Sequence, residues 1–306
     1  MGPAHPTPEW LRIGENVQSA LAAGRPVVAL ESTLIAHGLP WPLNVETARE
    51  SEAAVRAAGA TPATIAVLDG VPTVGLTDTQ LQDVARLPEV RKASRRDLGA
   101  AVALKHNAAT TVSATMALAH AAGIRVFATG GLGGAHREGD PFDVSADLAE
   151  LARTPVLVVC AGAKSILHLP RTLEVLETCG VPVAGYRTDA FPTFYVRDHG
   201  PALPISARVD SPQDAAALFE AHVRMGGGGV VLAQPCPEKV AIPAAEFEVW
   251  RADAEQEVRA QGVSGARVTP FLLARIAARS GGRALAANRA LIVANARLAA
   301  EVAARL

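Results

Sequence analysis

A lysine that could act as a nucleophile follows an apolar run typical of a buried strand. Lys164 comes after Pro155–Cys160, and only Ala161, Gly162 and Ala163 lie between them. Transfer out of water disfavours the ammonium form and lowers the pKa of a lysine. A lysine in apolar surroundings can therefore attack a carbonyl-like carbon at neutral pH. The ordinary alternative for this position is a surface lysine that closes a loop.

A carboxylate follows a second apolar run in the same way. Glu31 comes directly after Pro26–Leu30. Burial at the end of a strand raises the pKa of a carboxyl group and suits it to general acid catalysis, whereas a glutamate that only caps the next turn would have the same sequence signature. Ligands of open α/β sheets bind beyond the ends of the strands, so both residues are candidates for an active site.

A glycine-rich loop precedes the lysine. The segment Thr129–Gly134, TGGLGG, lacks Cβ atoms at four positions, which lets a polar or anionic ligand approach the backbone. Its spacing lacks the last glycine of the G-x-G-x-x-G dinucleotide motif, and the chain has no G-x-x-x-x-G-K-[ST] loop. Dinucleotide binding and P-loop phosphoryl transfer are therefore disfavoured.

Four side chains after this loop, which lie within one stretch of twelve residues, could bind a hard cation. Mg²⁺ and Mn²⁺ take carboxylates, water and occasionally imidazole, so one or two of these side chains would suffice. The alternative is that the aspartates cap a helix and the histidine belongs to a loop. The four are His136, Asp140, Asp143 and Asp147.

Basic side chains and two expected helix starts could bind a phosphate group. Lys92, Arg95 and Arg96 lie in the run RKASRRD, and helices are expected to begin near Thr110–Ser113 and Ser145–Asp147. The free amides and the dipole of a helix N-terminus attract anions. A solvated basic surface is the ordinary alternative for the arginines.

Composition limits the class of protein. The chain has 306 residues, 49% of them apolar, and a formal net charge of −1. Such a chain favours a small-molecule ligand over nucleic acid or a membrane surface. The three cysteines form no C-x-x-C pair, and no apolar run approaches ~20 residues, so we expect a cytoplasmic protein without disulfides. Alternating strand and helix signals predict one α/β domain over residues 1–306, with a loose tail at 1–9.

Local signals predict several turns and helix ends. Asp69-Gly70 lies between apolar runs and predicts a hairpin, hence some antiparallel pairing. Glycine and prolines after Ser32 predict a loop up to Pro42. The expected helix caps are Asn44, Ser113 and the capping box formed by Thr77 and Gln80.

Seven ordered segments resemble the pseudouridine-5′-phosphate glycosidases, the family that includes the indigoidine synthase A proteins. The resemblance extends from about Pro26 to Leu298 and is far more specific than one glycine pattern. The chain departs from the family in two places: it has His168 where members have Asp, and its segment between Arg137 and Asp143 is shorter. Neither departure affects a catalytic position. The segments are ALESTLIAHGLPWPLN, KASRRDL, NAATTVSATM, FATGGLGGAHR, DVSADLAELART, AGAKSIL and LAANRAL.

The resemblance implies a fold, a reaction and a set of site residues. It implies a three-layer α/β/α protein around a mixed sheet, a homotrimer with one Mn²⁺ per subunit, which interconverts pseudouridine 5′-phosphate plus water with uracil plus ribose 5-phosphate. Lys164 matches the nucleophile, Glu31 the proton donor and Asp143 the metal ligand. The residues that match substrate contacts are Lys92, Val112 with Thr111 beside it, Ser145, Ala146, Asp147 and Asn288.

This chemistry explains why an acid and an amine are needed together. The bond between ribose C1′ and uracil C5 is a carbon–carbon bond, so uracil leaves only if C5 gains a proton. An amine that attacks C1′ can hold the sugar as an imine-type adduct. Two other classes stay open on the residues alone: a sugar or nucleoside kinase, and a non-catalytic phosphosugar-binding protein.

Overall fold

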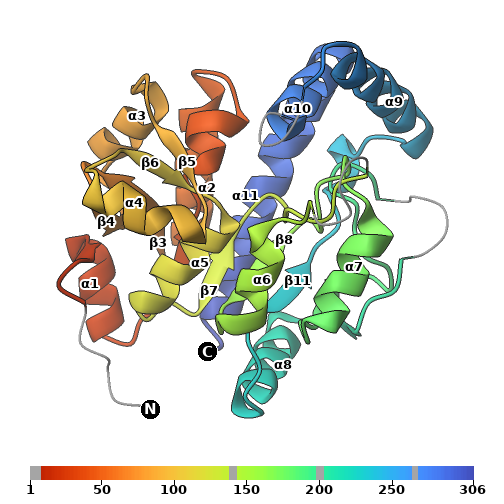
Figure 1. Ribbon diagram of the computed structural model, residues 1–306. Helices are drawn as coiled ribbons and strands as arrows, with labels where there is room; N and C mark the ends of the chain where they lie inside the picture. Colours follow the sequence, from red (N-terminus) through yellow and green to blue (C-terminus); the bar gives the residue numbers. More distant parts are fainter. Residues whose placement is uncertain (1–7, 138–142, 198–202, 264–267) are drawn as a thin grey trace.

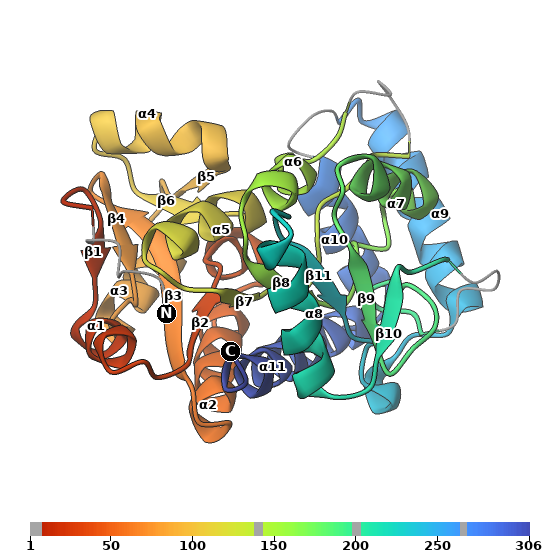
Figure 2. The ribbon, with the colours of Figure 1, turned by 90° about the horizontal axis from the view of Figure 1, so that it is seen from below.

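The computed structural model describes residues 8–137, 143–197, 203–263 and 268–306. Three sequence predictions therefore lie wholly or mainly outside the described residues: most of the tail 1–9, the cation candidate Asp140, and the shortened segment between Arg137 and Asp143. In the described part, strands and helices alternate along the chain, and helices cover both faces of one sheet (Figures 1 and 2).

The strands are β1 (Arg12–Ile13), β2 (Val27–Leu30), β3 (Thr61–Leu68), β4 (Val71–Val74), β5 (Arg91–Ala93), β6 (Ala108–Thr110), β7 (Val126–Ala128), β8 (Leu157–Cys160), β9 (Val183–Tyr186), β10 (Ala207–Val209) and β11 (Val230–Ala233). The helices are α1 (Glu15–Ala22), α2 (Leu43–Ala57), α3 (Asp78–Arg86), α4 (Leu98–Ala103), α5 (Val112–Ala121), α6 (Ala146–Arg153), α7 (Leu169–Thr178), α8 (Pro212–Arg224), α9 (Ala244–Ala260), α10 (Val268–Arg279) and α11 (Arg283–Ala303). Short helical turns lie at Leu34–Gly38, Arg95–Asp97 and Glu238–Val240.

The sheet is mixed and mostly parallel. Its main path runs β1-β4-β3-β2-β7-β8-β11-β9-β10, while β6 pairs with β3 and β5 pairs with β6. Only β3–β4 and β3–β6 are antiparallel among the strand pairs of the described residues. The β3–β4 hairpin turns at Asp69 and Gly70, both with positive φ, as the Asp-Gly pair predicts.

Side chains that point alternately to the two faces of the sheet along the buried strands form two cores. In β2, Val27 and Ala29 pack into the core that includes residues of α1, α5, α6 and α7. Val28 and Leu30 face the other way, into the core shared with α2, α8 and α11. This arrangement confirms the predicted three-layer α/β/α fold around a mixed sheet. No helix in the described ranges has the length and apolarity needed to cross a membrane.

The loop prediction after β2 is wrong in part. Leu34–Gly38 forms a π-helical turn in place of an open loop, and α2 begins directly after Pro42. Asn44 therefore lies inside the helix and is not its cap. Its Nδ2 donates to the Ile35 carbonyl oxygen at 2.7 Å, so its amide ties the helix to the π-helical turn.

The helix caps agree with the sequence at one position and differ at another. Thr77 and Gln80 form the predicted capping box of α3. At α5 the N-cap is Thr111 and not Ser113. Ser113 lies in the first turn, where its Oγ accepts a hydrogen bond from the Arg95 backbone N–H at 3.2 Å. A long-range contact of this kind leaves no local signal in the sequence.

Candidate active site

The carboxyl ends of three adjacent strands bring the proposed acid and nucleophile to one edge of the sheet. The strands β2, β7 and β8 are parallel neighbours. Glu31 follows β2, Thr129 follows β7, and the segment that leads to Lys164 follows β8. This is the edge where open α/β sheets bind ligands.

Glu31 lies in a desolvated position near three charged groups. The Thr129 hydroxyl donates a hydrogen bond to Oε1 of Glu31. Burial raises the pKa of Glu31 above its ordinary value and the charge of Asp147 adds to this, whereas the charge of Lys164, the Thr129 hydrogen bond and the charge of Lys92 act against it. The group is therefore protonated at a higher pH than an exposed glutamate, which suits a proton donor.

The backbone around Lys164 is held against the glycine-rich loop. Lys164 N donates to the Leu132 carbonyl oxygen at 3.1 Å, and Leu132 N donates to the Gly162 carbonyl oxygen at 2.9 Å. Gly162 has a φ of +82°, and a Cβ atom there would lie 1.8 Å from the carbonyl oxygen of Pro192. Only glycine fits this turn, which delivers the lysine to the strand ends.

Asp147 joins the glycine-rich loop to two helix N-termini. It is 5% exposed; its Oδ2 accepts from the Gly133 amide at 2.9 Å and its Oδ1 from the Ser113 amide at 3.0 Å. A Cβ atom on Gly133 would lie 2.7 Å from Oδ2 of Asp147 and 2.3 Å from Oγ of Ser145. The absence of a Cβ at Gly133 thus makes room for the protein's own side chains.

Four other predicted substrate contacts, Thr111, Val112, Ser145 and Ala146, lie at the same two helix starts. Thr111 is the N-cap of α5, which begins at Val112. Ser145 is the N-cap of α6, which begins at Ala146, and its Oγ accepts from the Asp147 amide at 3.3 Å. Because Asp147 bonds into the first turn of α5, it places these N-termini beside one another.

Of the three basic candidates, only Lys92 joins the charged cluster. Partial desolvation lowers the pKa of Lys92, as does the charge of Lys164, while the charges of Asp147 and Glu31 raise it. Arg95 instead pairs with the fully buried Glu150, N···O 3.1 Å. The side chain of Arg96 is 90% exposed and pairs with the neighbouring Asp97. The prediction that both arginines contribute to a phosphate site therefore finds no support in this geometry.

Helix α11 brings asparagines to the glycine-rich loop. Asn288, the predicted pocket residue, is 8% exposed, and a Cβ on Gly130 would lie 3.6 Å from its Oδ1. The analysis of the sequence missed two residues near this loop: Thr129, the partner of Glu31, and Asn295, whose Nδ2 donates to the Thr129 carbonyl oxygen at 2.9 Å. Asn295 follows Asn288 by two helical turns, so a polar residue repeated on one face of an alanine-rich helix could have indicated it.

The predicted metal ligand Asp143 lies two residues before Ser145, the N-cap of α6. Its carbonyl oxygen accepts from the His136 amide at 3.1 Å, and its side chain is exposed. Among the described residues, no three His, Cys, Asp or Glu side chains gather as a metal site. A hard cation that keeps most of its water needs only one or two carboxylates, and Asp143 fits that requirement.

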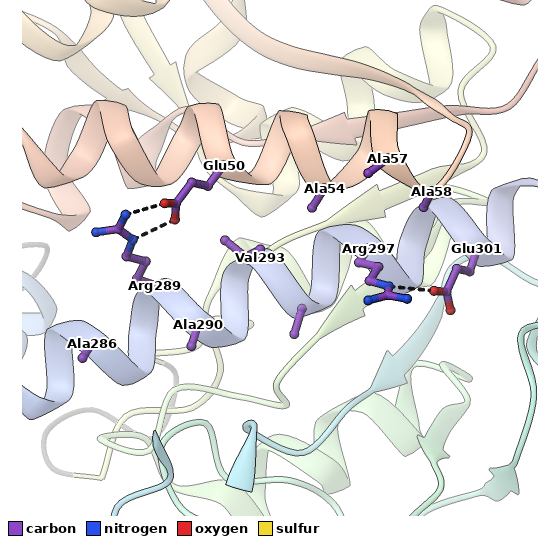
Figure 3. Close-up of a pocket in the computed structure, with 11 residues that line it drawn as sticks. Glu50, Ala54, Ala57, Ala58, Ala286, Arg289, Ala290, Val293, Arg297 and Glu301 are labelled. Carbon is purple, nitrogen blue, oxygen red and sulfur yellow. Dashed lines mark hydrogen bonds and ion pairs between the residues drawn. The ribbon is translucent and has the colours of Figure 1, made fainter. Parts of the chain in front are cut away.

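Two hollows lie near α2 and α11, and only one belongs to the site. A groove of about 850 Å³ runs between the helices, with ion pairs of Arg289 to Glu50 and Arg297 to Glu301, but none of the candidate residues lines it (Figure 3). A small cavity of about 20 Å³ lies beside Glu31, and Thr129 also lines it. Its volume is enough for about one water molecule.

Comparison with known proteins agrees with the geometry. Residues 16–305 match the family model described as indigoidine synthase A like protein. The chain is 54% identical to the pseudouridine-5′-phosphate glycosidase of Methylobacterium nodulans, over 97% of this chain and 88% of the relative. It is also 54% identical to that of Herpetosiphon aurantiacus, over 97% of this chain and 98% of the relative.

Two solved structures share the fold over nearly the whole chain. One is the prealnumycin C-glycosynthase in complex with ribulose 5-phosphate, with a TM-score of 0.90 and 42% identity over 98% of this chain and 97% of that one. The other is an indigoidine synthase A-like protein from Thermotoga maritima, with a TM-score of 0.87 and 35% identity over 98% of each chain. This chain therefore belongs to the indigoidine synthase A-like protein family, as its seven motifs predict.

Proposed function

We propose that this chain, a pseudouridine-5′-phosphate glycosidase by its relatives, breaks the glycosidic carbon–carbon bond through a covalent adduct on Lys164. The reaction takes pseudouridine 5′-phosphate and water reversibly to uracil and ribose 5-phosphate. The observation that best supports the mechanism is that Glu31 and the segment leading to Lys164 follow strands of one parallel set, β2, β7 and β8, and that the charge of Lys164 acts on the Glu31 carboxyl group. A carboxyl group whose pKa is raised by burial lies within electrostatic reach of an amine at the strand ends, as acid and nucleophile require.

The proposed course has three steps. The neutral amine of Lys164 attacks C1′ as the C1′–O4′ bond breaks and the ribose ring opens, and the proton that the nitrogen gives up passes to O4′. Glu31 then protonates C5 of uracil; the C1′–C5 bond breaks, its electron pair returns to the uracil ring, and the nitrogen lone pair forms the C1′=N bond. Water adds to C1′ of this iminium, and ribose 5-phosphate leaves as the free amine is restored.

Substrate binding supplies orientation. We assign the phosphate to Lys92 and the N-termini of α5 and α6, which Asp147 holds together. The contacting residues in this assignment are Thr111, Val112, Ser145, Ala146 and Asp147, with Asn288 on the side of the base. Binding energy from the phosphate, which does not react, would then place C1′ next to Lys164.

The remaining parts of the proposal rest on the family resemblance. Asp143 would hold one Mn²⁺ per subunit, with water as most of its ligands. Such an ion supplies positive charge and an ordered water shell. We also propose a cytoplasmic homotrimer; the three free cysteines, Cys160, Cys179 and Cys236, are compatible with a reducing compartment.

A second candidate function comes from the similarity to the prealnumycin C-glycosynthase. In that case the chain would form a carbon–carbon bond between a sugar phosphate and an acceptor other than uracil. Chromatographic measurement of uracil released from pseudouridine 5′-phosphate, without ATP, distinguishes the possibilities. We expect release that depends on Lys164; a kinase, a phosphosugar-binding protein or a synthase for another acceptor would release no uracil.

A further inference from the structure

A buried amide on α11 contacts the segment that carries the partner of Glu31. Asn295 is 1% exposed, and its Nδ2 donates to the carbonyl oxygens of Thr129 at 2.9 Å and Gly130 at 3.4 Å. Its Oδ1 accepts from Nε2 of Gln234 at 3.3 Å. Gln234 follows β11, so the Asn295 amide is fixed between the ends of two strands.

The same segment is bonded to the backbone that leads to the nucleophile. Thr129 N donates to the Val159 carbonyl oxygen at 3.0 Å, and Ala161 N donates to the Gly130 carbonyl oxygen at 2.9 Å. These bonds extend the β7–β8 ladder past the ends of both strands. Asn295 fixes this segment from α11, because its amide can bond to the Thr129 and Gly130 carbonyl oxygens only in this position of the segment.

Thr129 in turn fixes the carboxyl group of Glu31. A threonine hydroxyl has one proton to donate, and that of Thr129 goes to Oε1 of Glu31. An acidic proton on Glu31 then lies on Oε2, the oxygen left for the substrate. Proton transfer depends on direction as well as distance, and a misplacement of about 1 Å can cost about 100-fold in rate.

We propose that Asn295 is a positioning residue for proton transfer, which holds the Thr129 backbone so that the Thr129 hydroxyl orients Glu31. The assignment rests on the proposed function, since it takes Glu31 to be the proton donor. In this role Asn295 acts only through Thr129.

Two half-reactions of the Mn²⁺-loaded protein test this role. Uracil release from pseudouridine 5′-phosphate needs the proton from Glu31, whereas borohydride trapping of ribose 5-phosphate on Lys164 needs no departure of the base. Asn295→Leu keeps the size of the side chain and removes its hydrogen bonds. It should lower kcat for uracil release roughly 10- to 100-fold, leave KM within about twofold and leave trapping near the parental level.

The pH profile separates positioning from loss of structure. Burial and the charge of Asp147 raise the pKa of Glu31, while Lys164, Lys92 and the Thr129 hydrogen bond lower it. Loss of that hydrogen bond therefore raises the pKa further. The alkaline limb of kcat should move to higher pH in both Asn295→Leu and Thr129→Val, and Thr129→Ser, which keeps the hydroxyl, should restore the parental limb.

A double variant and a matched control complete the test. The double variant Asn295→Leu/Thr129→Val should lose no more kcat than Thr129→Val alone, because the two residues act in series. Asn44→Leu removes another buried amide, 3% exposed and bonded to the Ile35 carbonyl oxygen at 2.7 Å. Asn44→Leu should lower stability about as much as Asn295→Leu does, without moving the alkaline limb of kcat.

Each outcome decides between the claims. Three results would refute the role of Asn295 and leave the proposed function in place. The alkaline limb of kcat could stay where it is in the parent, the losses of kcat could add up in the double variant, or Asn295→Leu could lose trapping and uracil release equally. Absence of uracil release by the parent protein would refute the proposed function, and the role of Asn295 with it.

Discussion

Asp147 Oδ2 accepts a hydrogen bond from the backbone amide of Gly133 over 2.9 Å. This contact ties the glycine-rich loop to the N-terminus of α6, and the second oxygen of the same carboxylate reaches the α5 N-terminus through Ser113. A residue that the family resemblance assigns to substrate binding thus also braces the backbone of the site. Its loss should affect stability and activity together.

Asp147→Asn tests this brace. The amide group has one acceptor oxygen where the carboxylate has two, so one buried N–H loses its partner, at a cost of about 1–3 kcal/mol. We expect Tm to fall by several degrees and kcat/KM by roughly 10- to 100-fold. Because the charge of Asp147 raises the pKa of Glu31, the alkaline limb of kcat should move to lower pH. The control Asp78→Asn, an exposed residue on α3, should change neither Tm nor the limb by a comparable amount.

Glu31→Gln should raise stability at alkaline pH while abolishing uracil release. The folded-state pKa of Glu31 is raised, so the folded protein holds this proton more tightly than the unfolded chain does. The contribution of Glu31 to stability is therefore most favourable below the unfolded pKa and is lost as pH rises through the folded pKa. Thermal unfolding should show the variant more stable than the parent at pH 8, with the difference shrinking toward pH 4. A variant less stable than the parent at pH 8 would contradict the burial argument.

Lys92→Ala should weaken recognition of the phosphate. Loss of a charge-assisted contact of about 2–3 kcal/mol predicts a fall in kcat/KM of roughly 30- to 150-fold for pseudouridine 5′-phosphate. Unphosphorylated pseudouridine should be a poor substrate for the parent. The ratio of kcat/KM for the nucleotide to that for the nucleoside should be smaller in Lys92→Ala than in the parent. Arg96→Ala is the matched control, because Arg96 lies in the same basic run but is 90% exposed. Equal turnover of nucleoside and nucleotide by the parent would show that the phosphate site is misassigned.

Metal removal tests the assignment of Asp143. Exhaustive chelation should abolish or greatly reduce uracil release, and added Mn²⁺ should restore it better than Ca²⁺, whose bonds to oxygen are longer. Asp143→Asn should need more Mn²⁺ for half-maximal activity than the parent. Full activity after chelation would remove the metal from the mechanism.

The sequence predicts most of the elements that carry the site. Apolar runs closed by glycine, proline or a chemically distinct residue correctly indicate the strands that end before Glu31 and Lys164. The hairpin turn at Asp69 is correct for the same reason, since a two-residue turn depends only on neighbouring residues. The substitution at His168 also has a local explanation: Nδ1 of His168 accepts from the Arg171 amide at 3.1 Å, so it caps α7 as an aspartate could.

What the sequence does not predict depends on contacts between distant segments. Arg95 would be a plausible phosphate ligand by composition, but it pairs with Glu150, which lies 55 residues away. Thr129 meets Glu31 only because β7 and β2 are neighbours in the sheet, and their separation is 98 residues. Local periodicity indicates the strand ends that carry Glu31 and Lys164, but it contains no information about which distant segments pair there.

The covalent adduct is the central claim. A C1′ imine on Lys164 is reducible, so borohydride added with ribose 5-phosphate should leave a stable sugar-phosphate adduct on that residue. Lys164→Ala should lose turnover and labelling together and keep its fold, because β8 ends before this residue. Glu31→Gln should still form adduct, since the aldehyde of ribose 5-phosphate needs no departure of the base.

Peptide mapping of the borohydride-reduced protein is the most direct measurement. The mechanism predicts one added pentose phosphate, located on Lys164, in the parent and in Glu31→Gln, and none in Lys164→Ala. A label on Lys92, or near-parental turnover by Lys164→Ala, would contradict it.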